Sequence, residues 1–214
     1  GERSMKAMVI TRLGSLWHNR EPLQPMDLAL PEAREGEVLI RVSACGVCHT
    51  ELDEIEGRVS PSGFPRILGH EVVGRVEVLG PGASKFKKGD RVGIAWINWA
   101  CGKCSFCVKG EENLCDTARW TGKDADGGYA QYTVVSEGFA YPIPESFTDM
   151  KAAPLLCAGV IGYRALRLSG MEDGKVLGLY GFGASAHIVI QVAKHKYPNG
   201  KVFVFTRPDQ KEHQ

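Results

Sequence analysis

The chain has 214 residues, with 26 lysines and arginines against 25 aspartates and glutamates, and 43% of its side chains are hydrophobic. This length allows a sizeable core, in one large domain or in one and a half smaller ones. The near-neutral charge argues against a nucleic-acid-binding protein, which would normally be basic. Because the sequence shows neither an apolar run of about 18 residues nor a secretory leader, we expect a folded cytoplasmic protein without a membrane partner.

The N-terminal part of the chain is expected to consist of short β-strands. Apolar runs alternate with Gly and Pro turns up to about residue 155, which is typical of β-barrels. The spacing therefore predicts a partly open β-barrel. Its expected strands are residues 5–12, 38–44, 72–79, 91–94 and 129–135.

Four of the seven cysteines form a cluster with the spacing C-x2-C-x2-C-x7-C. They are Cys101, Cys104, Cys107 and Cys115. Four thiolates around Zn²⁺ make a closed tetrahedral site that stabilises the fold and leaves no position for a substrate. An iron–sulfur cluster uses similar spacings, but its usual run has three residues before a fourth Cys that Pro follows. Structural zinc is therefore the favoured interpretation, with an iron–sulfur cluster or metal-free cysteines as the alternatives.

Three further residues have the chemistry of a second metal site. Cys48 follows an expected strand, His70 lies in a Gly-His-Glu triplet, and Cys157 lies in an apolar helical pattern. Two Cys and one His form a three-ligand zinc set with an open fourth position, as in catalytic zinc sites. Spacing alone does not show that the three converge, and each by itself fits a core residue. Cys45 is expected to be a core residue.

A dinucleotide-binding motif follows near the end of the sequence. An expected strand at 175–180 leads into G-x-G-x-x-A, formed by Gly181, Gly183 and Ala186, and then into an expected helix and a strand at 201–206. In this context the helix N-terminus binds a pyrophosphate, and the glycines let the backbone approach it. The second strand ends at Thr206 and Arg207, which suit the 2′-phosphate of NADP. Asp209 leaves NAD as an alternative cofactor, and Arg207 is also compatible with a solvated loop residue.

Several motifs, in order along residues 5–206, resemble those of the zinc-dependent medium-chain alcohol dehydrogenases, in their bacterial-type branch. The motifs are CGVCHTEL at 45–52, GHEVVG at 69–74 followed by Gly80 and Ala83, KGDRV at 88–92, the four-cysteine cluster, and APLLCAG at 153–159. The resemblance implies a mixed α/β fold. A GroES-like, partly open β-barrel catalytic domain would occupy residues 1–155, and an incomplete Rossmann-like dinucleotide-binding domain residues 156–214.

Family members are longer, so we expect this chain to be C-terminally truncated relative to them. Many members are homo-oligomers, and their usual subunit contact lies in the part that this chain lacks. The resemblance also assigns roles to the second metal set. Cys48, His70 and Cys157 correspond to the catalytic zinc ligands, and Glu71 to a carboxylate beside the metal that is occasionally a ligand itself.

The resemblance extends to the residues around this set. Glu51 falls where a carboxylate orients the ligating histidine, His49 where a basic side chain contacts the cofactor pyrophosphate, and Thr50 where a hydroxyl binds the substrate oxygen. Trp96 falls where an aromatic lines the substrate pocket. Asp53 departs from the family, because many members have a histidine there as the outer base of the proton relay. Three hypotheses follow: the relay ends in cofactor ribose and water, the pKa of Asp53 is raised, or Asp53 is an ordinary solvated residue.

The implied activity is the interconversion of alcohols with aldehydes or ketones by hydride transfer to and from NADP or NAD. Two zinc ions per chain are expected, one catalytic and one structural, and the expected partners are small-molecule substrates. Two alternatives stay open. The chain could be a polyol or sugar dehydrogenase of the same family, or a non-catalytic zinc-binding fragment whose own activity is lost.

Overall fold

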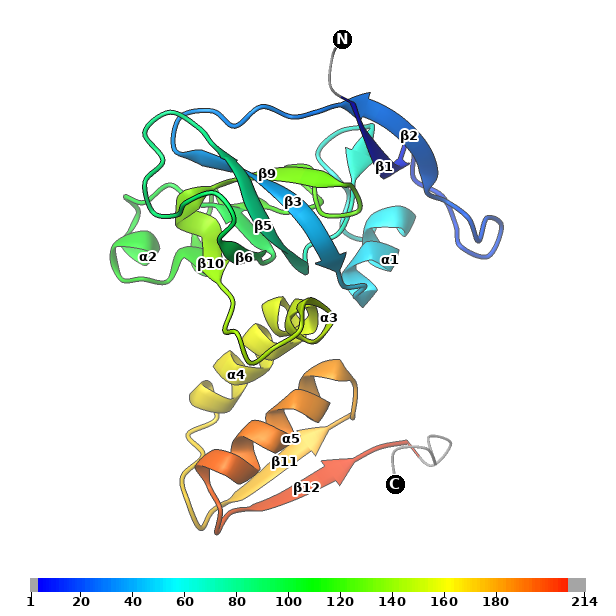
Figure 1. Ribbon diagram of the computed structural model, residues 1–214. Coiled ribbons are helices and arrows are strands. Elements are labelled where there is room, and N and C mark those ends of the chain that lie inside the picture. Colours follow the sequence, from blue (N-terminus) through cyan, green and yellow to red (C-terminus); the bar gives the residue numbers. More distant parts are fainter. Residues whose placement is uncertain (1–3, 208–214) are drawn as a thin grey trace. The chain divides into compact units, whose positions relative to one another are not determined.

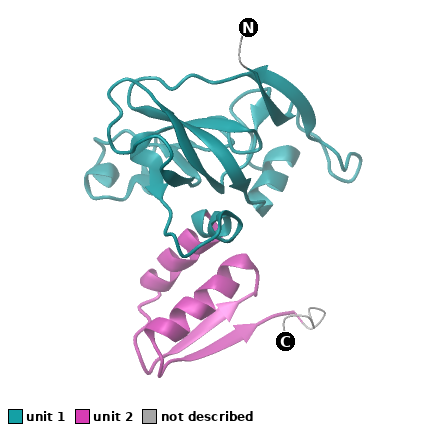
Figure 2. Ribbon diagram, in the orientation of Figure 1, with its two compact units in different colours: residues 1–156 teal, residues 157–214 magenta. Residues whose placement is uncertain are grey.

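The computed structural model describes residues 4–207, so Asp209 lies outside the described residues. The chain divides into two compact units, residues 1–156 and residues 157–214 (Figure 2). The domain boundary at 155/156 remains our proposal. Each unit is described by itself.

Two antiparallel sheets form most of the first unit (Figure 1). The five-stranded sheet has the order β10-β6-β5-β3-β9, and the three-stranded sheet the order β2-β1-β4. A two-stranded ribbon, β7-β8, lies outside them. The strands are β1 Ser4–Ile10, β2 Gln24–Ala29, β3 Glu37–Cys45, β4 Arg66–Ile67, β5 Val72–Leu79, β6 Arg91–Ile94, β7 Ile97–Trp99, β8 Arg119–Trp120, β9 Tyr132–Ser136 and β10 Ala140–Pro142. The predicted mixed α/β class is confirmed, although the sequence patterns missed β2, β4, β7, β8 and β10.

The core of the first unit lies on the five-stranded sheet. Valines and isoleucines of β3, β5 and β6 are at most 1% exposed. They are Val38, Ile40, Val72, Val76, Val92 and Ile94. β-Branched side chains suit this position because they pack well on a pleated, buried surface.

The first unit also contains short helices. They are α1 His49–Glu56, α2 Ser105–Val108 and α3 Asp149–Ala152, with 3₁₀ turns η1 Glu112–Leu114, η2 Glu137–Phe139 and η3 Ala153–Leu156. Helix α1 begins where the Glu51 side chain accepts the backbone N–H of Cys48, the capping residue, at 2.7 Å. It ends at Gly57, whose φ of 83° is a left-handed conformation that favours glycine.

Gly127 packs directly against the backbone that precedes His70. A Cβ added at this position would lie 2.2 Å from the carbonyl oxygen of Gly69, and a backbone atom cannot move aside cheaply. We therefore expect Gly127→Ala to lower the free energy of unfolding by about 1–3 kcal/mol. Gly138→Ala is the matched control, because its added Cβ would lie 3.7 Å from Ser136 Oγ, an ordinary contact distance. Urea unfolding that gives the same small change for both variants would contradict this packing argument.

The second unit is a strand–helix–strand unit with one preceding helix. Its elements are α4 Ala158–Leu168, β11 Val176–Tyr180, α5 Ala184–Lys196 and β12 Lys201–Phe205. Strands β11 and β12 are parallel, with Val176 opposite Lys201 and Tyr180 opposite Phe205. One face of this pair packs on α5 through Leu177 and Val189. The order agrees with the predicted strand, glycine turn, helix and strand. Within residues 4–207, no helix has the length and apolar character to cross a membrane.

Candidate metal centres and nucleotide-binding turn

The pairing of β3 with β5 brings two distant segments to one end of the five-stranded sheet. Cys45, the last residue of β3, lies opposite Val72, the first residue of β5. Cys48 lies three residues after Cys45, and His70 and Glu71 immediately precede Val72. The backbone N–H of Gly46 donates to the carbonyl of Glu71 at 3.0 Å and links the two segments. Antiparallel register therefore places these three side chains together.

Cys157 completes a four-residue group. It directly follows Leu156, which is buried in the first unit against Val73 and Ala95. One donor atom each from Cys48, His70, Glu71 and Cys157 lies within 4.8 Å of the others. Thiolate and imidazole are the donors that zinc prefers. The group therefore fits a zinc ion with three strong ligands and a carboxylate beside them.

Glu51 contacts two members of this group, Cys48 and His70. Its Oε2 accepts the N–H of Cys48, and its Oε1 lies 2.6 Å from His70 Nδ1. Apart from this pairing, neither His70 Nδ1 nor Glu51 Oε1 has a hydrogen-bond partner in the described chain. Both side chains are buried, at 1% and 2% exposure. A carboxylate on Nδ1 fixes the ring tautomer and directs Nε2 to a metal, which is the usual arrangement around ligating histidines.

Gly46 makes room for Glu71, a role that strand and turn patterns did not reveal. A Cβ at position 46 would lie 1.8 Å from Glu71 Oε2, so any other residue would displace the carboxylate. Its neighbour Cys45 stays outside the metal group and packs against the main core. Burial raises the pKa of the Cys45 thiol to about 12, as expected for a thiol in the core.

Thr50 and Trp96 also lie next to the group. Thr50 Oγ1 is 3.6 Å from Cys48 Sγ. The Trp96 ring meets the His70 ring edge-on, with centroids 4.9 Å apart. Trp120 stacks on Trp96 at 5.4 Å, and sequence reasoning missed it because nothing in its local pattern points to the site.

The arrangement around Asp53 argues against two of the three hypotheses for it. Its carboxylate forms an ion pair with Arg58 Nε at 2.5 Å and lies 3.5 Å from His49 Nδ1. The hydrogen bond from Arg58 lowers the pKa of Asp53 below its ordinary value. The hypothesis of a raised pKa is therefore wrong, and Asp53 is a paired rather than an ordinary solvated residue. A carboxylate whose pKa lies below its ordinary value is a poor proton acceptor near neutral pH.

The four-cysteine cluster forms a separate group. Donor atoms of Cys101, Cys104, Cys107 and Cys115 lie within 4.8 Å of one another, and none of the four is in a disulfide. The backbone N–H of Cys104 donates to Cys101 Sγ at 3.3 Å, and that of Cys107 to Cys104 Sγ at 3.5 Å. Hydrogen bonds from the backbone N–H groups of Lys103 and Cys104 lower the pKa of the Cys101 thiol, whereas burial raises that of Cys107 to about 12. Four cysteine sulfurs this close together fit a closed zinc site.

The glycine turn of the second unit has the geometry that its motif predicts. Gly181 has a φ of 89°, and its N–H donates to the carbonyl of Phe205, which ties the turn to β12. Gly183 caps the N-terminus of α5, and an added Cβ there would meet no atom within 4 Å. Ala186 lies in the first turn of α5, while Thr206 and Arg207 directly follow β12. The helix N-terminus is therefore open to an anion.

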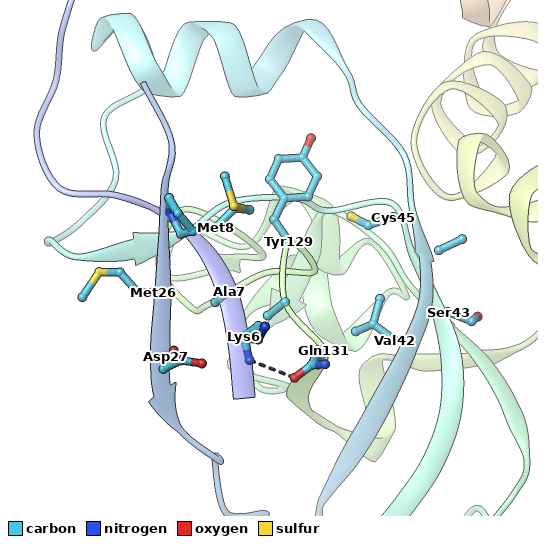
Figure 3. A pocket seen from close by; sticks show the side chains of 13 residues that line it. Lys6, Ala7, Met8, Met26, Asp27, Val42, Ser43, Cys45, Tyr129 and Gln131 are labelled. Atoms are coloured by element: carbon cyan, nitrogen blue, oxygen red, sulfur yellow. Dashed lines mark hydrogen bonds between the residues drawn. The ribbon is translucent and has the colours of Figure 1, made fainter. Parts of the chain in front are cut away.

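A hollow of about 530 Å³ lies elsewhere in the first unit (Figure 3). Met8, Met26, Cys45 and Tyr129 are among the side chains that line it, and the Lys6 N–H donates to Gln131 Oε1 at 2.9 Å. None of the predicted site residues lines this hollow. We assign no function to it.

Fold and metal groups together define the class of protein. The chain belongs to the family described as the alcohol dehydrogenase GroES-like domain, whose model matches residues 34–145. The predicted resemblance to zinc-dependent medium-chain alcohol dehydrogenases is thereby confirmed.

Individual relatives agree with this assignment. The chain is 45% identical over 209 residues to the probable alcohol dehydrogenase AdhA of Mycobacterium tuberculosis, covering 95% of this chain and 59% of the relative. Among solved structures it resembles a cobalt- and zinc-bound thermostable alcohol dehydrogenase from Pyrobaculum aerophilum, with a TM-score of 0.88, 28% identity and coverage of 99% and 62%. It also resembles CAD from Helicobacter pylori complexed with NADP(H), with a TM-score of 0.86, 27% identity and coverage of 100% and 62%. The chain thus spans about three fifths of the length of these relatives.

Proposed function

We propose that this chain is the metal-binding part of a zinc-dependent alcohol dehydrogenase that interconverts alcohols with aldehydes or ketones, using NADP or NAD. The convergence of Cys48, His70, Glu71 and Cys157 carries this proposal, because it is the donor set of a catalytic rather than a structural zinc site. The names of the relatives and of the solved structures support it.

Cys48, His70 and Cys157 would hold the catalytic zinc, with Glu71 beside it. A bound zinc ion supplies Lewis acidity, which lowers the pKa of an alcohol hydroxyl towards neutrality. Glu51 orients His70 and accepts the backbone N–H of Cys48. Thr50 lies close enough to Cys48 for its hydroxyl to bind the substrate oxygen and accept its proton. Trp96 and Trp120 would present an apolar wall to the carbon part of the substrate.

A second, structural zinc would be held by the four-cysteine group. Its four ligands leave no open position, so its contribution is to the stability of the loop that spans residues 101–115.

The nucleotide would bind at Gly181, Gly183 and Ala186, with its pyrophosphate at the N-terminus of α5. The His49 imidazole, which lies 3.5 Å from Asp53, would contact the pyrophosphate. Thr206 and Arg207 favour NADP over NAD, whereas the similar solved structures include both an NADP(H) complex and an NAD complex. Because Asp53 is paired with Arg58, we expect the proton relay to end in cofactor ribose and water.

A small-molecule alcohol or aldehyde is the proposed substrate. A cytoplasmic location and a homo-oligomeric assembly remain predictions from the sequence.

The direct test is alcohol-dependent reduction of NADP and NAD by the zinc-loaded chain, together with binding of the reduced cofactors. We expect reduction with simple alcohols. Thr50→Val, which removes only the hydroxyl, should lower turnover about 100-fold or more, while Thr50→Ser should retain most of it. A chain that binds zinc but neither binds nor reduces a nicotinamide cofactor would instead be a non-catalytic zinc-binding fragment.

A further inference from the structure

Helix α1 buries two carboxyl groups, of which the proposed function uses only one. Glu51 and Glu54 are three residues apart, so they lie on the same face of the helix. Glu51 is 2% exposed, and Glu54 is fully buried. Ile55, on the same buried side, packs with Ile10 and Leu68. The face that carries both carboxyls therefore points into an apolar interior.

The two carboxyls differ in their partners. Both oxygens of Glu51 are engaged, one by His70 Nδ1 and one by the N–H of Cys48. Neither Oε1 nor Oε2 of Glu54 has a hydrogen-bond partner among the described residues. An ionised carboxylate in such a position costs several kcal/mol, and a buried group normally takes up a proton instead.

We propose that Glu54 is a buried, neutral carboxylic acid that acts as a positioning residue for the Glu51–His70 pair, because it leaves Glu51 as the charged carboxyl on this face. An ionised Glu54 would repel Glu51 and weaken its hold on His70. A neutral Glu54 fills the same space without a competing charge. The proposal deepens the proposed function, since Glu51 and His70 belong to the proposed zinc site.

The charged groups around Glu54 support the neutral form. Burial is the largest cause that raises the pKa of Glu54, to about 8, and the negative charges of Glu51, Asp124 and Asp53 raise it further. Lys123 is the opposing cation and lowers the pKa. Its ammonium is paired with Asp124 Oδ1 at 3.0 Å, and this pairing weakens the stabilisation that Lys123 gives to an ionised Glu54.

The sign of the pH effect follows from this raised pKa. The folded state keeps the proton of Glu54 up to about pH 8, whereas the unfolded chain loses it near an ordinary pKa of about 4.3. Stability is therefore highest in acid and falls as the pH rises between these values, then levels off. Relative to Glu54→Gln, the unfolding constant of the wild type should rise about tenfold for each pH unit between about pH 5 and pH 8.

The decisive experiment compares wild type, Glu54→Gln and Glu56→Gln by NMR and infrared spectroscopy. The His70 Nδ1–H resonance should shift with a midpoint near the pKa of Glu54, about 8, in the wild type and stay constant in Glu54→Gln. The infrared carbonyl band of a protonated carboxylic acid should be present at about pH 7 in the wild type and absent from Glu54→Gln. Glu56→Gln, which changes a carboxylate paired with Arg58 instead, should behave as the wild type in both measurements.

A His70 resonance that titrates identically in Glu54→Gln, or an unchanged infrared band, would overturn the proposal. Glu54→Leu provides the same comparison if the glutamine variant does not fold. None of these measurements uses a substrate or cofactor, so their failure is distinguishable from the failure of the proposed dehydrogenase activity.

Discussion

Cys104→Ser is expected to lower the free energy of unfolding by about 4 kcal/mol or more, because the loss of a metal site is among the few causes of so large an effect. Structural zinc contributes its binding free energy directly to folding. Cys104 also accepts the N–H of Cys107 and donates its own N–H to Cys101, so the substitution disturbs the loop as well as the ligand set. Thermal and urea unfolding of the zinc-loaded protein measure the change.

Cys48→Ser is the matched control for that experiment. Cys48 belongs to the other group, at the start of α1 and outside the loop of four cysteines. We expect this variant to lose alcohol-dependent turnover with little loss of stability. Equal destabilisation by the two substitutions would show that the groups do not divide into a structural and a catalytic site.

Glu51→Ala is expected to cost about 2–5 kcal/mol of stability, because an N–H donor that loses its acceptor in a buried place costs about 1–3 kcal/mol. The substitution leaves both His70 Nδ1 and the N–H of Cys48 without their acceptor. It should also weaken zinc binding at the catalytic group by about 10- to 100-fold, because carboxylates behind ligating histidines typically contribute that much. Chelator competition measures the zinc affinity, and urea unfolding the stability.

Glu51→Gln and Glu56→Ala separate the causes. The glutamine variant retains an oxygen acceptor and should lose less stability than Glu51→Ala. Glu56 is on the same helix but pairs with Arg58 nearer the surface, so its loss should cost clearly less stability than the loss of Glu51. A zinc affinity that is the same in wild type and Glu51→Ala would contradict the role of Glu51 in orienting His70.

The four-cysteine group was predictable because its members lie within 15 residues of sequence, so local spacing alone brings them together. The strand–turn–helix–strand unit was predictable for the same reason. Cys48 and His70 are far apart in sequence, and their convergence depends on the register in which Cys45 faces Val72. Hydrophobic alternation indicates strands but does not specify which strands pair or in which register.

Other features depend on contacts that leave no trace in a local pattern. Trp120 reaches the site only through the pairing of β7 with β8 and its stacking on Trp96. The pairing of Asp53 with Arg58 required the turn that follows Gly57, and without it a raised pKa was a reasonable hypothesis. The burial of Glu54 is likewise invisible in sequence, because a charged residue on a short helix normally faces solvent.

Zinc content per chain tests the central claim most directly, because that claim is that two separate groups of side chains each bind one ion. Metal analysis of the purified chain should give two zinc ions, and one in either Cys48→Ser or Cys104→Ser. A wild-type chain that holds one zinc ion, and keeps it in Cys48→Ser, would show that Cys48, His70 and Cys157 do not form a metal site.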